Sequence, residues 1–334
     1  VSELNKLIKV STSTNADGTF NVYIGSGQQL VVGAKAMEMT ATQSMSDPSK
    51  IVVGLKTAGG TLELPESLIV GGELSGLLTF RNQSLEATTN ELGRVAASLA
   101  LTFNAQNSLG QDLLGNISGD SGFVGNIFNV PDPKVLPNYT NTGSGSVGAV
   151  FSAPTAPTAP SYQGNFYTDL TTSDYQVQFG AAGAYSVVRL SDNQTVQTGT
   201  GVGSVSFDGI TLNISATGNN GDKFLIKPFS EVARNIDIDN RVVADPRLLA
   251  AAAPVRVTQD ITNTGSMKMS QGVVGTGYNV SGLPATITAT ATQLTGVPNG
   301  WRAVYADGTI VPAMALPAGT GAVEIGRASC RERV

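Results

Sequence analysis

The segment "GELSGLLTFRNQSLEATTNELGRVAASLALTFNAQNSLG", residues 72–110, decides the fold, because it carries the one extended helical repeat in the sequence. Leu78, Leu85, Leu92 and Leu99 recur every seven residues, which is typical of one helix in a bundle. We therefore predict a long helix with one apolar face. The residues that we expect to act in packing and assembly, called the stripe below, are Leu74, Leu78, Leu85, Leu92, Val95, Leu99 and Phe103.

Two interpretations of this helix remain open. An amphipathic helix can cover the small sheets of its own domain, or it can belong to a bundle whose other helices lie outside this chain. Gly93 destabilises a helix by about 1 kcal/mol relative to alanine, which is more easily tolerated where a neighbour packs against it. The chain also opens at Val1 in a helix-like segment, so we expect that an N-terminal part is missing and favour the bundle.

The composition predicts an α+β fold that is mainly β. The 334 residues include 39 glycines and 15 prolines, and only 13% are charged, which is typical of turn-rich β-structure. Histidine is absent and Cys330 is the single cysteine, so we expect no catalytic, cofactor or metal site. A net charge of −5 with one tryptophan argues against nucleic-acid binding, and no apolar run is long enough to span a membrane.

The last ten residues, "IGRASCRERV" at 325–334, differ in composition from the rest of the chain. They resemble the translated read-through of a sequencing adapter, so we treat them as an artefact tail. A genuine basic tail is the alternative interpretation.

Changes in composition divide the chain into five segments. Asp17-Gly18 and Asp208-Gly209 predict tight hairpin turns, and "GSGSVG" at 143–148 is interpreted as linker. The expected organisation is one long helix plus β-hairpins, then one complete and one truncated small β-domain. The segments are a partial inner helical-bundle domain (1–110), an irregular Pro/Gly-rich connector (111–165), an outer β-domain (166–254), a truncated second β-domain (255–324) and the tail (325–334).

The two β-domains resemble each other weakly. Residues 174–196 and 285–311 both run from an alternating strand through a glycine turn to an aromatic-led strand. Trp301 then corresponds to Tyr185, and Asp307-Gly308 corresponds to Asp192-Asn193. The sequence therefore predicts an internal repeat.

Asp237 and Asp239 are the only candidates for acid–base chemistry. They alternate along one predicted strand, with Arg234 and Arg241 nearby, which favours a solvated charged face. A carbohydrate-active enzyme would need the two carboxylates about 5–10 Å apart across a cleft. We retain that function as a remote alternative.

One stretch resembles a known family. Gly72, Leu74, Gly76, Leu77, Leu78, Phe80 and Arg81 match the pattern Gly-x-Leu-x-Gly-Leu-Leu-x-Phe-Arg, and Leu92-Gly93, Phe103, Asn104 and Gln106 match its later part. Residues 3–33 also resemble the helix-to-hairpin passage of that family, and "GDKFLIKP" at 221–228 resembles the end of its outer β-domain more loosely. On these residues the chain resembles the flagellar hook-associated protein 1 family.

The resemblance implies a structural subunit at the junction between flagellar hook and filament, acting by packing and not by catalysis. It implies an extracellular location, reached through the flagellar secretion system without a cleaved signal peptide. Implied partners are further copies of itself, the hook protein and the second junction protein. The family's flagellin-like terminal helices have no counterpart here, so we interpret the chain as an internal fragment whose stripe pairs with them. The alternatives are another axial protein or an adhesin-like β-array.

Overall fold

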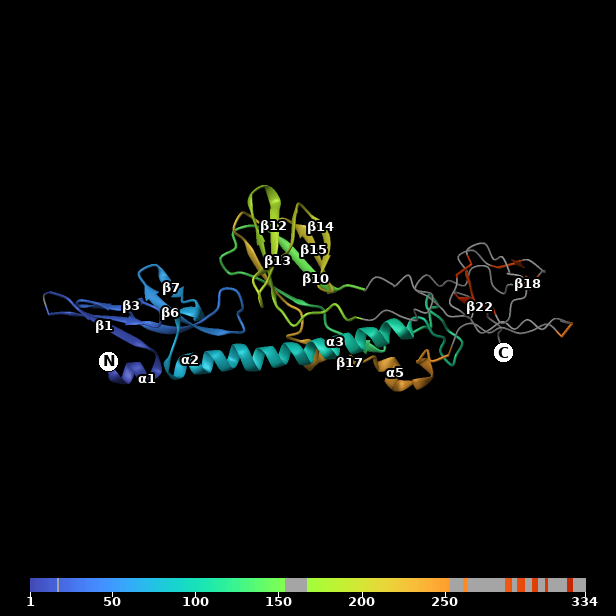
Figure 1. Ribbon diagram of the computed structural model, residues 1–334, viewed down its shortest axis with the longest axis horizontal. Helices are drawn as coiled ribbons and strands as arrows, with labels where there is room; N and C mark the ends of the chain where they lie inside the picture. The colour runs from blue at the N-terminus through green and yellow to red at the C-terminus, as the bar shows by residue number, and fades with distance from the viewer. Residues whose placement is uncertain are drawn as a thin grey trace. The chain divides into compact units, whose positions relative to one another are not determined.

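The computed structural model combines one long helix with several small sheets, which confirms the mainly β, α+β prediction (Figure 1). The structure describes residues 1–16, 18–153 and 167–252, with short segments at 261–262, 286–289, 293–297, 302–305, 310–311 and 323–326. Two compact units are distinguished. Unit 1 comprises Val1–Arg94, Asp132–Ser152 and Thr171–Ala233, and unit 2 comprises Val95–Pro131, Ala153–Leu170 and Arg234–Val334.

Unit 1 begins with a hairpin module of one short helix and two antiparallel sheets. Helix α1 (Ser2–Leu7) confirms the predicted opening helix. The first sheet, in the order β1-β2-β3-β4, contains Val10–Thr14, Phe20–Ile24, Gln28–Val32 and Lys35–Ala36. The second contains β5 (Met39–Gln43), β6 (Ile51–Thr57) and β7 (Gly60–Glu63). Gly18 turns the first hairpin with a φ of 80°, whereas Asp17 lies outside the described residues.

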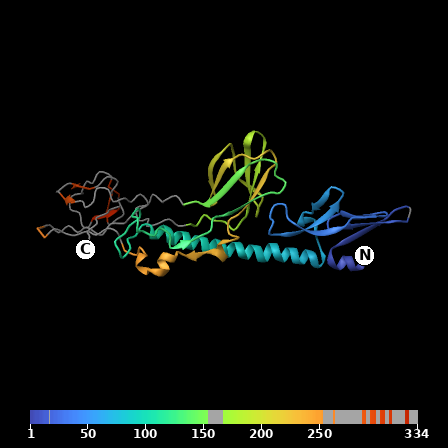
Figure 2. The same cartoon turned by 180° about the vertical axis from the view of Figure 1, so that it is seen from behind.

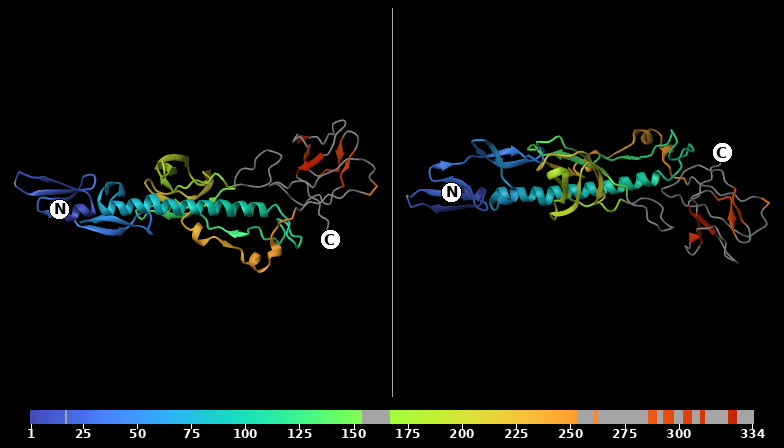
Figure 3. Two further views of the ribbon diagram at one scale, coloured as in Figure 1. Left: turned by 60° about the horizontal axis from the view of Figure 1, so that its bottom comes forward. Right: turned by 90° about the horizontal axis from the view of Figure 1, so that it is seen from above.

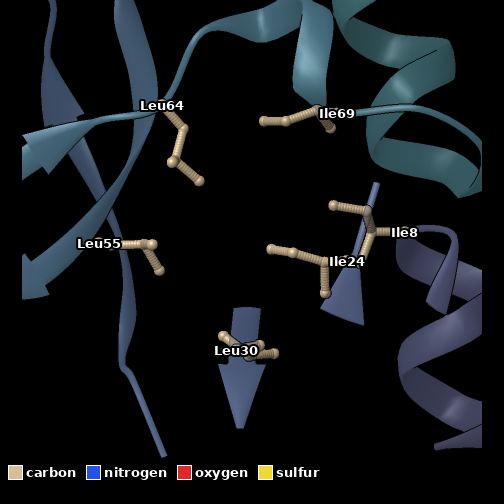
Figure 4. Close-up of a cluster of buried hydrophobic side chains, with 6 residues drawn as sticks. All are labelled: Ile8, Ile24, Leu30, Leu55, Leu64 and Ile69. Carbon is tan, nitrogen blue, oxygen red and sulfur yellow. The ribbon is translucent and has the colours of Figure 1, made fainter. Parts of the chain in front are cut away.

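The hairpin module has its own apolar core, which joins α1, both sheets and the segment before the long helix (Figure 4). The buried side chains point towards a common centre and come from elements far apart in the sequence. They are Ile8, Ile24, Leu30, Leu55, Leu64 and Ile69. A 3-10 turn, η1 (Glu66–Leu68), leads from this core to the helix.

The predicted long helix runs without a break from Gly72 to Asn107, as both views of Figure 3 show. It consists of α2 (Gly72–Thr79), the π-helical segment η2 (Phe80–Glu86) and α3 (Ala87–Asn107). The Arg81 guanidinium pairs with Glu66, and the Asn82 Nδ2 donates to Glu66 at 2.5 Å, so the π-helical segment is tied to η1. The leucine spacing did not predict this wider turn, because periodicity reports only a mean repeat.

The outer β-domain is a sandwich of two antiparallel sheets (Figure 2). The rings of Tyr175 and Phe207, one from each sheet, lie 5.1 Å apart edge to face. The five-stranded sheet, in the order β13-β12-β11-β16-β9, contains Gln194–Thr200, Ala184–Arg189, Tyr175–Phe179, Lys223–Lys227 and Lys134–Pro137. The three-stranded sheet, in the order β10-β15-β14, contains Ser146–Phe151, Ile210–Ala216 and Gly203–Phe207. A 3-10 turn, η3 (Ala181–Gly183), joins β11 to β12.

In this sandwich the predicted hairpin turn and the predicted alternation of buried residues are both observed. Phe207 pairs with Ile210, and Asp208 and Gly209 take φ values of 43° and 75° in the turn between them. Ile210, Leu212 and Ile214 alternate into the core along β15.

The irregular connector predicted over 111–165 is wrong for its central part, which supplies β9 and β10 to the sandwich. The segment 143–148, interpreted as linker, runs into β10 at Ser146. Prolines and glycines misled the prediction: Pro137 ends an edge strand, where a missing N–H is tolerated. The first strand of the sandwich therefore begins at Lys134, not after Phe166, and residues 154–166 lie outside the described residues.

Unit 2 holds the end of α3 and a short two-stranded sheet. β8 (Phe128–Asn129) pairs with β17 (Asp237–Ile238), and α5 (Asn240–Ala244) and η4 (Pro246–Leu248) follow. The helical turn α4 (Val232–Asn235) precedes β17.

Only short pieces of the predicted second β-domain are described. They are β18 (Thr288–Ala289), β19 (Leu294–Thr295), β20 (Arg302–Tyr305), β21 (Ile310–Val311) and β22 (Val323–Gly326). β22 pairs with β20 and includes the first two residues of the expected tail. Trp301, Asp307 and Gly308 lie outside the described residues, as do residues 327–334, so the repeat, the truncation and the tail stay predictions.

Candidate assembly surface

The structure divides the seven stripe residues into two groups. Leu74 and Leu78 are partly buried and pack against the core of the hairpin module. These two side chains therefore hold the helix to its own module. The remaining five are exposed to solvent.

The five exposed residues form an apolar face along α3 and the end of η2. Their exposed fractions are 57% for Leu85, 59% for Leu92, 49% for Val95, 52% for Leu99 and 54% for Phe103. Steps of three, four and four residues from Leu92 onwards place the last four on one side of the helix. We call these five residues the exposed stripe.

Sequence reasoning missed two exposed apolar residues at the start of the same helix. Leu77 is 67% and Phe80 is 60% exposed. Both lie in the quoted segment, and Leu77 directly precedes a stripe leucine. Their apolar character is visible in the sequence, but both positions fall outside the seven-residue repeat of leucines.

Another face of the helix is packed against the chain itself. Gly93 lies against Phe229, whose ring stacks on Phe151 at 6.0 Å. A helix has room for such a close backbone approach where the side chain is a single hydrogen. The presence of glycine at position 93 is thus explained by packing within unit 1, against a residue of the segment that follows β16.

In unit 2 the packed face is formed by small and amide side chains. Ala97 and Ala100 are fully buried. Asn104 bonds Phe128 in both directions: its Nδ2 donates to the Phe128 carbonyl at 2.8 Å, and its Oδ1 accepts from the Phe128 N–H at 2.9 Å. Asn107 donates to the Val124 carbonyl at 2.7 Å. These amide side chains hydrogen-bond backbone groups of residues 124 and 128, and they hold that segment of the chain against the helix.

An ion pair flanks the exposed stripe. Arg94 lies 2.5 Å from Glu91 one turn earlier on the helix. The hydrogen bond from Arg94 lowers the pKa of Glu91, so both groups are charged at neutral pH. Charged groups beside an apolar strip are typical of a surface that contacts another chain through its apolar centre and keeps a polar rim.

The two candidate acid–base residues have structural contacts. Asp239 caps α5 by accepting from the Arg241 N–H, and its carboxylate lies 2.9 Å from the Arg241 guanidinium. The hydrogen bond from the Arg241 side chain lowers the pKa of Asp239. Asp237 accepts from the N–H of Ile238 at 2.8 Å. A general acid needs a raised pKa, so Asp239 is unsuited to that role.

Within the described ranges, no group of three or more histidine, cysteine, aspartate or glutamate residues could hold a metal ion. Over the same ranges, no helix combines the length and the apolar character needed to cross a membrane.

Comparison with known proteins links this arrangement to the flagellum. Residues 1–123 match the helical domain of flagellar hook-associated protein FlgK, and residues 138–228 match the D2-like domain of flagellar hook-associated protein 1. Flagellar hook-associated protein 1 of Escherichia coli K12 is 34% identical over 258 residues, which are 76% of this chain and 42% of that protein. The Salmonella typhimurium protein of the same name is 33% identical over 72% of this chain and 41% of its own length.

A solved structure agrees with the sequence comparison. The flagellar hook junction protein FlgK from Burkholderia pseudomallei matches 98% of this chain with a TM-score of 0.76 and 30% identity, and 62% of that protein is covered. The chain therefore spans about two fifths of the curated relatives and less than two thirds of this structure. The resemblance read from residues 72–106 is confirmed, and the chain belongs to the flagellar hook-associated protein 1 family.

Proposed function

We propose that this chain is part of a structural subunit of the bacterial flagellum at the hook–filament junction, and that the exposed stripe is its assembly surface. The observation that carries the proposal is the run of five exposed apolar side chains on one helix, from Leu85 to Phe103. Soluble proteins rarely leave such a face uncovered, because contiguous apolar patches promote association.

We further propose that helices from parts of the full-length protein beyond these 334 residues cover the exposed stripe. The length of the relatives supports this, since the chain spans only 42% of the Escherichia coli protein. The seven-residue spacing of Leu85, Leu92 and Leu99 suits packing against another helix. Further copies, the hook protein and the second junction protein are the proposed neighbours in the assembled junction.

The proposed subunit acts by contact and has no catalytic role. The family consists of hook-associated proteins, and the contacts of Asp237 and Asp239 are those of capping and surface residues. The proposed location is outside the cell, after export through the flagellar secretion system without cleavage of a signal peptide.

The proposal is tested with the full-length protein in a strain that lacks it. Leu92→Lys combined with Leu99→Lys places two charges on the exposed stripe, and we expect secretion to continue while filaments fail to attach. The matched control is Thr79→Lys combined with Gln83→Lys, which changes two exposed polar residues of the same continuous helix outside the exposed stripe. Normal filaments in the stripe variant would refute the proposed assembly surface.

A further inference from the structure

A cluster of five charged side chains and one amide lies where the turn of residues 44–50 meets the sandwich and the helix, all within unit 1. Asp47 is 2% exposed, and its carboxylate lies 2.7 Å from the Lys227 ammonium on β16. Lys50 lies 2.6 Å from Glu86 on the helix. The cluster, called the joint below, consists of Asp47, Lys50, Glu86, Asn90, Asp174 and Lys227.

Direct hydrogen bonds tie the same turn to the sandwich. The N–H of Tyr139, just after β9, donates to the Met45 carbonyl at 2.9 Å. The Asn138 Nδ2 donates to the Ser46 hydroxyl at 2.9 Å. The joint therefore combines backbone contacts with buried charge, and it holds the sandwich against the hairpin module.

Asp174 differs from the other carboxylates of the joint because it has no ion-pair partner among the described residues. Its side chain receives one hydrogen bond, from the Asn90 Nδ2 at 3.3 Å, and that amide also donates to the Thr172 carbonyl at 3.1 Å. Both nearby ammonium groups are already paired, Lys227 with Asp47 and Lys50 with Glu86. An ionised Asp174 is thus poorly compensated in this position.

The electrostatic surroundings point in the same direction. Burial raises the pKa of Asp174 to about 6, although Lys227, Lys50 and the Asn90 hydrogen bond oppose the rise. The negative charge of Glu86 adds to it. These groups come from β16, the 44–50 turn and the helix, and the Leu190 N–H directly after β12 donates to the Asp174 carbonyl at 2.9 Å.

We propose that acid strengthens the joint: when Asp174 takes up a proton, the sandwich packs more stably against the helix and the 44–50 turn. We call this packed arrangement the seated state and its equilibrium with the detached arrangement the seating equilibrium. An acid that is harder to ionise in the seated state than in water makes that state bind more protons. The seated state therefore becomes more stable, relative to the detached state, as the pH falls through about 6 towards the ordinary aspartate pKa of 3.8. Between pH 7.5 and 5.0 the gain is about tenfold in the seating equilibrium.

Asp47 does not cancel this effect in that range. Burial opposes its ionisation, but hydrogen bonds from Lys227 and Ser49 outweigh burial and lower its pKa. The stability that ionised Asp47 contributes is lost only below its ordinary value of 3.8.

Hydrogen exchange of the whole chain tests the proposal at the Tyr139 amide, whose bond to Met45 spans the joint. After correction for the intrinsic exchange rate, we expect its protection factor to be about tenfold higher at pH 5.0 than at pH 7.5. In Asp174→Asn, which cannot ionise, protection should be independent of pH. The matched control Asp169→Asn, at an exposed aspartate, should keep the tenfold change.

Equal protection at the two pH values in the unaltered chain would overturn the proposal, and this comparison needs no variant to fold. A tenfold change that persists in Asp174→Asn would also overturn it, because another group would then be responsible.

Discussion

Phe229 lies directly on the backbone of Gly93: a Cβ added at position 93 would come within 2.6 Å of the Phe229 Cβ and 2.7 Å of its carbonyl oxygen. This contact brings the end of the sandwich to the middle of the long helix. The sequence suggested that a neighbour packs at Gly93, but it pointed to a helix outside the chain. The neighbour is instead a residue of this chain, 136 positions later.

Gly93→Ala should destabilise unit 1 by about 1–3 kcal/mol, because the new methyl group must displace the Phe229 backbone. The higher helix propensity of alanine, about 1 kcal/mol, offsets only part of this. Urea unfolding followed by far-ultraviolet circular dichroism measures the change.

Gly76→Ala is the matched control, since a Cβ at this α2 position meets nothing within 4 Å. It should stabilise the chain by up to about 1 kcal/mol. If both substitutions stabilise equally, the close approach of Phe229 is refuted.

Leu55→Ala should destabilise the hairpin module by about 2–5 kcal/mol, because Leu55 is 2% exposed at the centre of its core. Leu62→Ala on the adjacent strand β7 removes a side chain that is 56% exposed, and it should change stability by less than about 0.5 kcal/mol. Thermal unfolding compares the two variants. Equal losses would show that the module is not organised around this core.

Lys227→Met should cost about 3–5 kcal/mol at pH 7, because it leaves the buried Asp47 carboxylate without its cation. Asp47 can then be protonated more easily, so the difference from the unaltered chain should shrink as the pH falls towards 4. Denaturant unfolding at several pH values measures the trend. The control Lys56→Met breaks an exposed pair with Glu38 and should cost less than about 1 kcal/mol. A loss that is constant with pH would argue against the ion pair.

Residues 132–233 should fold as an independent sandwich, because they contain all eight strands of its two sheets. The shorter piece 166–228, which starts where the sequence predicts the outer β-domain to start, lacks β9 and β10 and should remain unfolded. Nuclear magnetic resonance spectra of the two pieces provide the comparison. Equally dispersed spectra would mean that β9 and β10 are dispensable.

Local patterns predicted the fold wherever neighbouring residues determine the structure. The alternation in residues 210–214 and the turn at Asp208-Gly209 identified β15 and its hairpin, and the leucine repeat identified the long helix. The strands β9 and β10 were missed because Pro137 and Gly148 look like loop residues until their strand partners, far away in the sequence, are known.

The candidate site was predictable in part. The repeat identified an apolar face, but it could not reveal that Leu74 and Leu78 are used by the chain's own core, which depends on Ile8, Ile24 and Leu55. The joint around Asp174 was not predicted, since its residues come from segments between 47 and 227 and carry no shared pattern.

The exposed stripe is tested most directly by the reactivity of single cysteines placed at 85, 92 and 99, with Cys330 replaced by serine. A cysteine at Val202, which is 65% exposed on the sandwich, is the control that should react in every state. We predict that all three helix positions react rapidly with a water-soluble maleimide in the 334-residue chain, and that all three are protected in flagella assembled from the full-length protein. Protection already complete in the chain alone, or rapid reaction in the assembled flagella, would contradict the assignment of this face to assembly.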